Sequence, residues 1–465
     1  MVAEKRQFKM PHTLVILFAL LIVAWLAGRF IPSGAYEMAK DPVSGKNLVV
    51  PGTFHYVEKT TISFFALMDY VVQGFIKSAD LFFLILFSGA AFHLVTLSGA
   101  LHSLVGKVMQ VGKRKNWVFI VTMTAIFAAL GTTHGVNLFI PFVPVTLTFA
   151  YALGFDSLVG VGVILIGGAV GFSTGTFQVN TTLVAQEIAG LAPYSGIGYR
   201  ALCLLIFYLV SVAWLIRYSH KIAQDPSVSA MYDLDQVNEL RTQAQVQSFE
   251  PLTLRGLLSL GALVVALALF VYGGTKLKWK LNNFSAVFLW LCVVVGLINR
   301  YRPSKLVKEM LQGAKTMFGA AVIIGLARSI SMILSDSGVI DTVVHGLSLV
   351  LGYAPGFMRA PVMFIINIFV NMLITSGSGQ AAVVMPLFLP VADLIGMTRQ
   401  TAILAYNFGD GFCNYILPTS TALMGLLGAA NVPYDRWMRF FWKLFCLWVG
   451  VGVVLVWLAD VVRLA

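Results

Sequence analysis

Charged side chains are scarce in this chain. Of its 465 residues, 11% are Asp, Glu, Lys or Arg, 58% are hydrophobic, and the mean hydropathy is +0.85. A typical soluble domain carries about 25% charged residues, so the composition excludes that class. Apolar runs long enough to cross a bilayer recur along the sequence, which predicts an all-α polytopic membrane protein.

Cysteine is also scarce, and other expected marks are absent. Cys203, Cys292, Cys413 and Cys446 lie in apolar stretches without the spacing of metal ligands, so we expect neither disulfides nor a metal site. The sequence lacks G-x-x-x-x-G-K-[ST], which argues against ATP drive. We expect no cofactor beyond Na⁺ or H⁺ as a coupling ion. The net charge of +12 comes from short basic clusters beside apolar runs, which indicate cytoplasmic loops and no nucleic-acid partner.

Four apolar segments are interrupted by small and polar residues. "GTTHGVN" divides 117–153 and "TSGSGQ" divides 360–396 into limbs too short for two full crossings, which predicts two re-entrant hairpins. "GFSTGTFQVNTT" lies within 156–190, and "NFGDGFCNYILPTST" lies within 398–430. Their glycines, proline, asparagines and hydroxyl residues continue a helix poorly, so we predict that both helices are broken.

The interrupted segments form a repeat. Aligned without gaps at an offset of 240 residues, 171–194 and 411–434 share seven of 24 positions. The hairpins match at an offset of 242, with Gly135 against Gly377 and Gly154 against Gly396. An odd number of crossings separates the copies, which predicts two inverted repeats, as in secondary transporters. The halves would be 1–217 and 254–465, joined by a cytoplasmic linker at 218–253.

The breaks indicate where a substrate would bind. In lipid, unpaired backbone groups cost several kcal/mol each, so a break is tolerated where it lines a polar cavity. Freed amides there can hold an anion, and freed carbonyls a cation. The predicted substrate-binding residues are Asn180, Thr181, Thr182, Ser376, Gly377, Ser378, Gly379, Asn414, Thr419, Ser420 and Thr421. Further candidates are Thr132, Thr133, His134, Asn137, Ser173 and Thr174.

Asp410 is the strongest single candidate, since an acid inside a membrane segment is costly and marks a functional site. It could pair with a substrate amino group, bind a coupling cation or carry a proton. The structural alternative is a carboxylate that caps nearby amides.

Three stretches carry a family resemblance. "FIPSGAYE" (30–37), "SGSGQAAVVMPLFLPVADLIG" (376–396) and "NFGDGFCNYILPTS" (407–420) are similar to the YfcC-type branch of the C4-dicarboxylate anaerobic carrier (DcuC) and basic amino acid antiporter (ArcD) family, in the ion transporter superfamily. The resemblance covers essentially the whole chain. It implies an elevator-type carrier and a homodimer, with amino acids such as arginine and ornithine, or dicarboxylates, as substrates. That branch carries a Gly-Met-x-Glu-Glu type sequence at the first hairpin tip. The acid-free "GTTHGVN" weakens the basic amino acid assignment here.

The sequence therefore predicts a secondary active transporter in the bacterial inner membrane and no enzyme. Its partners would be the lipid bilayer and a small carboxylate-bearing substrate, with amino acids as the first class, moved by an antiporter or an ion-coupled symporter. A C4-dicarboxylate carrier is the alternative. A passive channel and an intramembrane hydrolase are remote alternatives.

Overall fold

A computed structural model describes residues 13–40, 47–59, 61–99, 116–236, 253–277 and 279–464. The described chain is mostly helical, and six of its helices are long and apolar enough to cross a membrane. The prediction of a helical, multi-pass membrane protein is confirmed at this level. Residues 237–252 of the predicted linker lie outside the described residues.

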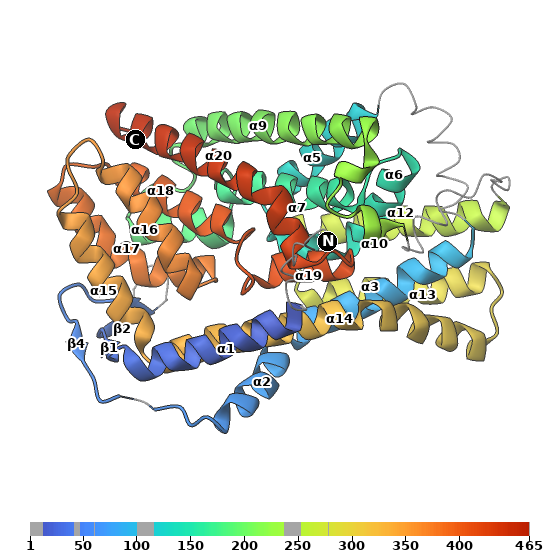
Figure 1. Ribbon diagram of the computed structural model, residues 1–465, viewed down its shortest axis with the longest axis horizontal. Helices are drawn as coiled ribbons and strands as arrows, with labels where there is room; N and C mark the ends of the chain where they lie inside the picture. Colours follow the sequence, from blue (N-terminus) through green and yellow to red (C-terminus); the bar gives the residue numbers. More distant parts are fainter. Residues whose placement is uncertain are drawn as a thin grey trace, which may run out of the picture.

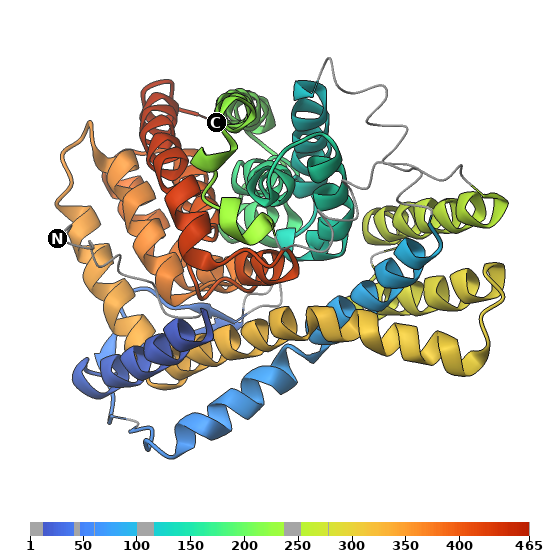
Figure 2. The same cartoon turned by 45° about the vertical axis from the view of Figure 1, so that its right-hand side comes forward.

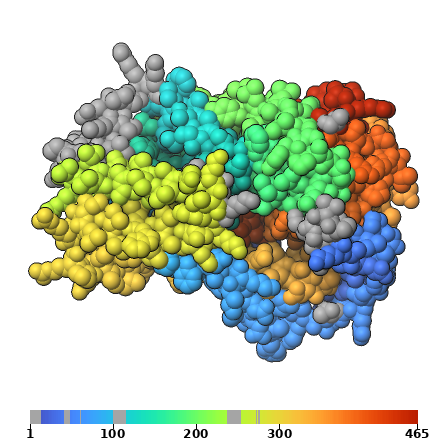
Figure 3. Space-filling model, turned by 180° about the vertical axis from the view of Figure 1, so that it is seen from behind, coloured from blue at the N-terminus to red at the C-terminus, as the bar shows by residue number. Residues whose placement is uncertain are grey.

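Six helices, among them the longest helix, α14, form one layer (Figures 1 and 2). They are α1 (Thr13–Phe30), α2 (Ala66–Lys77), α3 (Ala79–Leu97), α12 (Leu254–Thr275), α13 (Leu281–Ile298) and α14 (Pro303–Asp336). The α3–α14 crossing is close, since a Cβ atom on Gly89 would lie 2.8 Å from the carbonyl oxygen of Gly313. Small residues at a crossing let two membrane helices approach. Seen from behind, α12 and α13 lie at one end of the molecule and α1 at the other (Figure 3).

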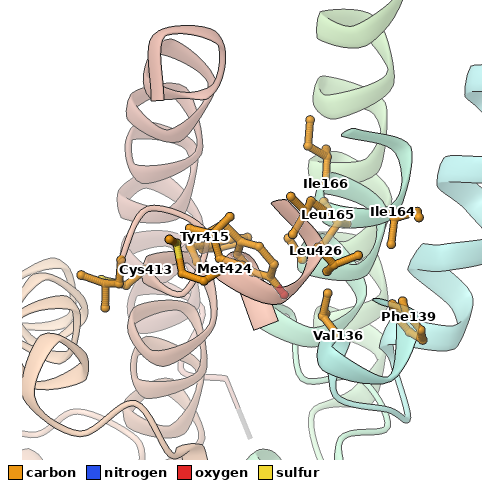
Figure 4. Packing of buried hydrophobic residues seen from close by; sticks show 14 of the residues in the cluster. Val136, Phe139, Ile164, Leu165, Ile166, Cys413, Tyr415, Met424 and Leu426 are labelled. Carbon is orange, nitrogen blue, oxygen red and sulfur yellow. The ribbon is translucent and has the colours of Figure 1, made fainter. Parts of the chain in front are cut away.

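The second layer holds the interrupted segments. From the first half it contains α5 (Trp117–Gly131), η1 (Val136–Phe142), α6 (Val143–Ala152), α7 (Ser157–Ser173), η2 (Val179–Leu183), α8 (Val184–Ile188) and α9 (Ile197–Gln224). From the second half it contains α15 (Val339–Gly352), α16 (Arg359–Leu373), α17 (Gly377–Leu394), α18 (Arg399–Cys413), α19 (Thr421–Ala429) and α20 (Tyr434–Val461). Buried side chains of η1, α7 and α19 pack together, among them Val136, Leu165 and Leu426 (Figure 4). The two halves of the chain therefore share one core.

Three features differ from the sequence-based expectation. The prediction of an all-α chain is incomplete, because β1 (Gly34–Ala35) pairs with β4 (His55–Tyr56) and β2 (Met38–Lys40) with β3 (Asn47–Val49). Strands this short carry too little alternation to be recognised. Helices α2 and α15 were not predicted, since their 12 and 14 residues are too few to span a bilayer. Helix α9 continues to Gln224, past residue 217 where the first half was predicted to end, and Ser219 and Ile222 are buried in its last turns.

The described part of the linker folds back onto the start of α7. Asp235, in α10 (Tyr232–Asp235), accepts hydrogen bonds from the Tyr151 hydroxyl at 3.0 Å and the Ser157 amide at 2.9 Å. Asp156, the N-cap of α7, accepts from the Val159 amide at 2.9 Å and from two hydroxyls. Both carboxylates therefore accept a hydrogen bond from an amide in the first turn of α7, where the helix dipole also favours negative charge.

This contact gives a first prediction. Asp235→Ala leaves a buried amide and a buried hydroxyl without an acceptor, so the free energy of unfolding should fall by about 2 kcal/mol. The matched control is Asp233→Ala on the same short helix, since Asp233 is largely exposed and pairs with Arg436 at the surface. Thermal unfolding in detergent should show a clear drop for Asp235→Ala alone. Equal drops would mean that the linker contact does not hold α7.

Candidate functional site

The two breaks and the two hairpin tips meet in one place. Helix α17 contacts η2 and α8, α18 contacts η2, and α19 contacts η1. The first break needs a tight turn, because Gly175 has φ +66 and a Cβ atom there would lie 2.5 Å from Nδ2 of the Asn407 side chain. Only glycine readily combines that backbone conformation with such a close approach. The first break is thus shaped to fit α18 of the other half.

A cavity of about 460 Å³ lies between these elements. Its size is typical of a small-molecule site. The lining residues are Gly135, Val136, Asn137, Phe172, Asn180, Thr181, Thr375, Ser376, Gly377, Ser378, Asn414, Tyr415, Ser420, Thr421 and Ala422. Hydroxyl, amide and backbone groups thus supply its polar surface. Among the described lining residues there is no Asp, Glu, Lys, Arg or His.

The structure brings half of the predicted site residues into this lining. These are Asn137, Asn180, Thr181, Ser376, Gly377, Ser378, Asn414, Ser420 and Thr421. The other predicted residues do not line the cavity: Thr132, Thr133, His134, Ser173, Thr174, Thr182, Gly379, Asp410 and Thr419. The spacing of these residues along the sequence did not distinguish those that line the cavity from those that do not.

Several of the predicted residues outside the lining support the breaks instead. Thr182 donates to the Gly175 carbonyl at 2.8 Å and accepts from the Asn407 side chain at 2.9 Å, so it ties the first break to α18. Thr174 and Thr132 each donate to a carbonyl of their own helix, as membrane hydroxyls often do. The first hairpin tip is held by a residue that was not predicted, Gln178, which donates to the carbonyls of Gly131 and His134.

Two helix N-termini point their first residues into the cavity. Helix α17 begins at Gly377, and its N-cap Ser376 accepts from the Gly379 amide. Helix α19 begins at Thr421, and its N-cap Ser420 accepts from the Leu423 amide. Because both N-caps also line the cavity, the positive ends of two helix dipoles converge on it. A helix N-terminus binds carboxylate and phosphate groups readily.

Asp410 lies behind the second hairpin tip and does not line the cavity. Its side chain has no exposed surface, and its Oδ1 accepts from Asn371 Nδ2 at 2.8 Å. A Cβ atom on Gly377 would lie 2.9 Å from Asp410 Oδ2. The tip therefore separates this carboxylate from any cargo in the cavity in the conformation described here.

Arg200 in α9 is a buried cation that sequence reasoning missed. Its side chain has no exposed surface, its Nη2 donates to Gln400 Oε1 at 3.0 Å, and its Nη1 donates to Thr182 Oγ1 at 3.4 Å. No carboxylate forms an ion pair with it in the described part of the chain. Its position three residues into a helix is common for an interfacial arginine, so the sequence held no signal of its burial.

The apolar lining residues were missed as well. Val136, Phe172, Tyr415 and Ala422 lie beside predicted polar residues, and nothing in their type marks a site. Thr375 could have been found, because it belongs to the same polar tip as Ser376.

Known proteins resemble the chain along most of its length. The family model described as "C4-dicarboxylate anaerobic carrier" matches residues 10–461. An uncharacterized protein of Haemophilus influenzae is 27% identical, with 97% of each chain covered. YfcC of Escherichia coli, which is provisionally assigned as a basic amino acid antiporter, is 26% identical, with 93% of each chain covered.

Two solved transporter structures are similar at a lower level. The YdaH transporter of Alcanivorax borkumensis has 14% identity and a TM-score of 0.41, with 97% of this chain and 98% of that chain covered. MtrF of Neisseria gonorrhoeae, described as one of a class of antimetabolite efflux pumps, has 15% identity and a TM-score of 0.41, with 98% and 96% covered. Scores this low support no detail of the site.

The family model extends over nearly the entire sequence, and the resemblance inferred from the second hairpin and the second break is confirmed. This chain belongs to the C4-dicarboxylate anaerobic carrier family of membrane transporters.

Proposed function

We propose that this protein is a secondary active carrier of small carboxylate-bearing metabolites, with amino acids as the first substrate class, in the bacterial cytoplasmic membrane. The observation that carries the proposal is the convergence of two helix N-termini on one cavity of about 460 Å³. Hydroxyl and amide groups from both breaks surround that cavity. A carboxylate would bind at the N-termini of α17 and α19, and an amino group would bind to the neighbouring amide and hydroxyl oxygens.

The proposal includes inverted repeats and elevator movement. Gly154 and Gly396, which the sequence aligns at an offset of 242, both have positive φ, at +84 and +73. Each is followed by a capped helix, with Asp156 before α7 and Thr398 before α18. Helices α9 and α20 each have 28 residues. These matches support a duplicated unit that carries the cavity.

In the elevator proposal, the second layer moves against the layer around α14. Small residues meet where α19 crosses α14, since a Cβ atom on Gly428 of α19 would lie 2.7 Å from the Cβ atom of Ala320 of α14. Small residues at a crossing let two membrane helices lie close together. The α14 layer would be the scaffold, and a homodimer would form through it.

C4-dicarboxylates are the second candidate. Two helix N-termini could hold two carboxylates, and no acidic side chain lies among the described lining residues to repel them. The same lining disfavours a substrate with net positive charge, because Asp410 lies behind the tip. The name of the matched family favours this class too.

Ligand-induced stabilisation tests the proposal. Purified protein in detergent would be heated with arginine, ornithine, aspartate or succinate. The matched controls lack every carboxylate: the amides of arginine and ornithine and the diamides of aspartate and succinate. A substrate at 100 times its Kd should stabilise the native state by about 2.7 kcal/mol. The effect should disappear for the amides and should weaken in the Ser376→Ala/Ser420→Ala double variant. Equal stabilisation by acid and amide, or by none of the compounds, would refute the proposal.

A further inference from the structure

Two buried oxygen atoms beside the second hairpin tip have no hydrogen-bond partner among the residues that the structure describes. They are Asp410 Oδ2 and Asn371 Oδ1. Neither side chain has any exposed surface. Buried polar atoms in native proteins are nearly always paired, so two neighbouring orphans require an explanation.

The bonds that are present show what is missing. Asn371 Nδ2 donates to Asp410 Oδ1 at 2.8 Å and to Gln380 Oε1 at 3.2 Å. Gln380 Nε2 in turn donates to Asn367 Oδ1 at 3.0 Å. The amide donors are thus already in use, and the two atoms left over are both acceptors. A carboxylic acid and a primary amide form a cyclic pair in which the amide N–H donates to one carboxyl oxygen and the acid O–H donates to the amide oxygen. The first bond of that pair is present, and the two oxygens without a partner are the atoms that the second bond would join through one proton.

The charges around Asp410 agree with this account. No Lys, Arg or His side chain pairs with Asp410 in the described part of the chain. The titratable groups near it are Tyr406, Cys413 and Tyr415, which are neutral near pH 7. Asn371 of α16 donates to Asp410, and Gly377 of α17 lies beside Asp410 Oδ2. Gln380 bonds Asn371 and Thr181 lies next to Gly377, and none of these four side chains carries a charge. The α17 N-terminus supplies a partial positive charge at most, so an ionised Asp410 would be poorly compensated.

We propose that Asp410 and Asn371 form a proton-binding site, in which Asp410 Oδ2 carries the proton and donates a hydrogen bond to Asn371 Oδ1. The inference rests on the proposed function for its consequence, which is that H⁺ is the coupled ion. A Cβ atom on Gly377 would lie 2.9 Å from Asp410 Oδ2, and Gly377 itself lines the cavity at the α17 N-terminus. An ionised Asp410 would repel a carboxylate bound there, and a protonated one would not. Proton and substrate therefore favour each other's binding, and this coupling is reciprocal.

The first test needs no substrate. Melting temperatures would be measured from about pH 5 to about pH 8 for the wild type, Asp410→Asn and Asn371→Leu. A proton held by the native state and absent from the unfolded chain makes stability fall as pH rises, so the wild type should lose stability relative to Asp410→Asn. Asn371→Leu keeps the carboxyl group but removes the N–H that donates to Asp410 Oδ1 and favours the ionised form, so the decline should persist and move to higher pH. Asp393→Asn is the control, because that exposed carboxylate pairs with Arg399 at 2.7 Å, and its removal should leave the decline intact.

Two results would overturn the inference. One is an identical pH profile for the wild type and Asp410→Asn. The other is stabilisation of the wild type, but not of Asp410→Asn, by sodium chloride over choline chloride at equal ionic strength, which would indicate a sodium site.

A second arm uses the compound that stabilises the wild type in the ligand panel. Its affinity should fall by up to tenfold per pH unit in the wild type and stay constant in Asp410→Asn. If no compound binds, the proposed function fails, while the substrate-free arm still decides whether Asp410 holds a proton.

Discussion

Gly377→Ala is expected to lower substrate affinity roughly ten- to hundredfold while the protein remains folded. The new Cβ atom would lie 2.4 Å from Thr181 Cγ2 and 2.9 Å from Asp410 Oδ2, closer than side-chain carbons approach other atoms. Thr181 belongs to the first break, so the second tip must move away from it and the cavity must deform. Overpacking of this kind costs about 1–3 kcal/mol, and each 1.4 kcal/mol is a factor of ten in affinity. Binding would be measured by ligand-induced stabilisation or by uptake into proteoliposomes.

Gly379→Ala is the matched control, since it lies in the same first turn of α17. The three atoms nearest to its Cβ atom would belong to Ser376 and Ile374, at 3.3 Å or more, and none of them belongs to the first break. We expect near wild-type affinity for this variant. An equal loss in both variants would show that alanine perturbs the α17 N-terminus in general, and that the contact between the two tips is not what matters.

Two Gln400 variants are expected to differ in stability, with Gln400→Leu below the wild type and Gln400→Glu not below it. Gln400→Leu removes the acceptor at 3.0 Å from Arg200 Nη2 and leaves a fully buried guanidinium with Thr182 as its remaining partner, so stability should fall by about 3 kcal/mol. Gln400→Glu places a carboxylate at the same point and in the first turn of α18, where the helix dipole also favours it. We expect Gln400→Glu to be at least as stable as the wild type.

A double-mutant cycle supplies the control for this pair. In an Arg200→Met background no buried charge needs an acceptor, so Gln400→Leu should be much less destabilising there. The melting temperatures of the four proteins measure the coupling directly. A coupling energy near zero would mean that other contacts stabilise Arg200 and that its hydrogen bond with Gln400 contributes little to stability.

The breaks were predictable because they are local. Glycine, proline and clustered hydroxyl residues oppose a helix wherever they occur, and the structure ends α7 at Ser173 and α18 at Cys413, within the predicted motifs. The strands β1 to β4 and the short helices α2 and α15 were not predictable in the same way. Their ends depend on contacts with distant elements, such as β3 and α15 with α17, and their lengths match no membrane-spanning pattern.

The depth of each polar side chain was not predictable. Asp410 and Asn414 lie one turn apart, and Asn414 Nδ2 donates to the Asp410 carbonyl at 2.7 Å, yet only Asn414 lines the cavity. What separates them is the tip at Gly377, which covers Asp410 and comes from a different helix. Arg200 presents the same difficulty, because its main partner Gln400 is 200 residues away in the sequence. Spacing along one segment therefore identifies the candidates but cannot order them by distance from the cargo.

The shared core also has a consequence for how the protein is made. Thr182 bonds Asn407, 225 residues later in the chain, and Gly175 fits against the same side chain. At 5–20 residues per second, a ribosome needs roughly 10–50 s to extend the chain from the first residue to the second. During that interval the polar groups of the first break lie in or near the bilayer without their eventual partners. Insertion chaperones, and the proteases that remove stalled intermediates, would therefore act on the chain in which the first break is inserted and its partners in the second half are not yet synthesised. A ribosomal pause between the codons for Thr182 and Asn407 should lower the yield of intact carrier more than an equal pause before the first break is synthesised.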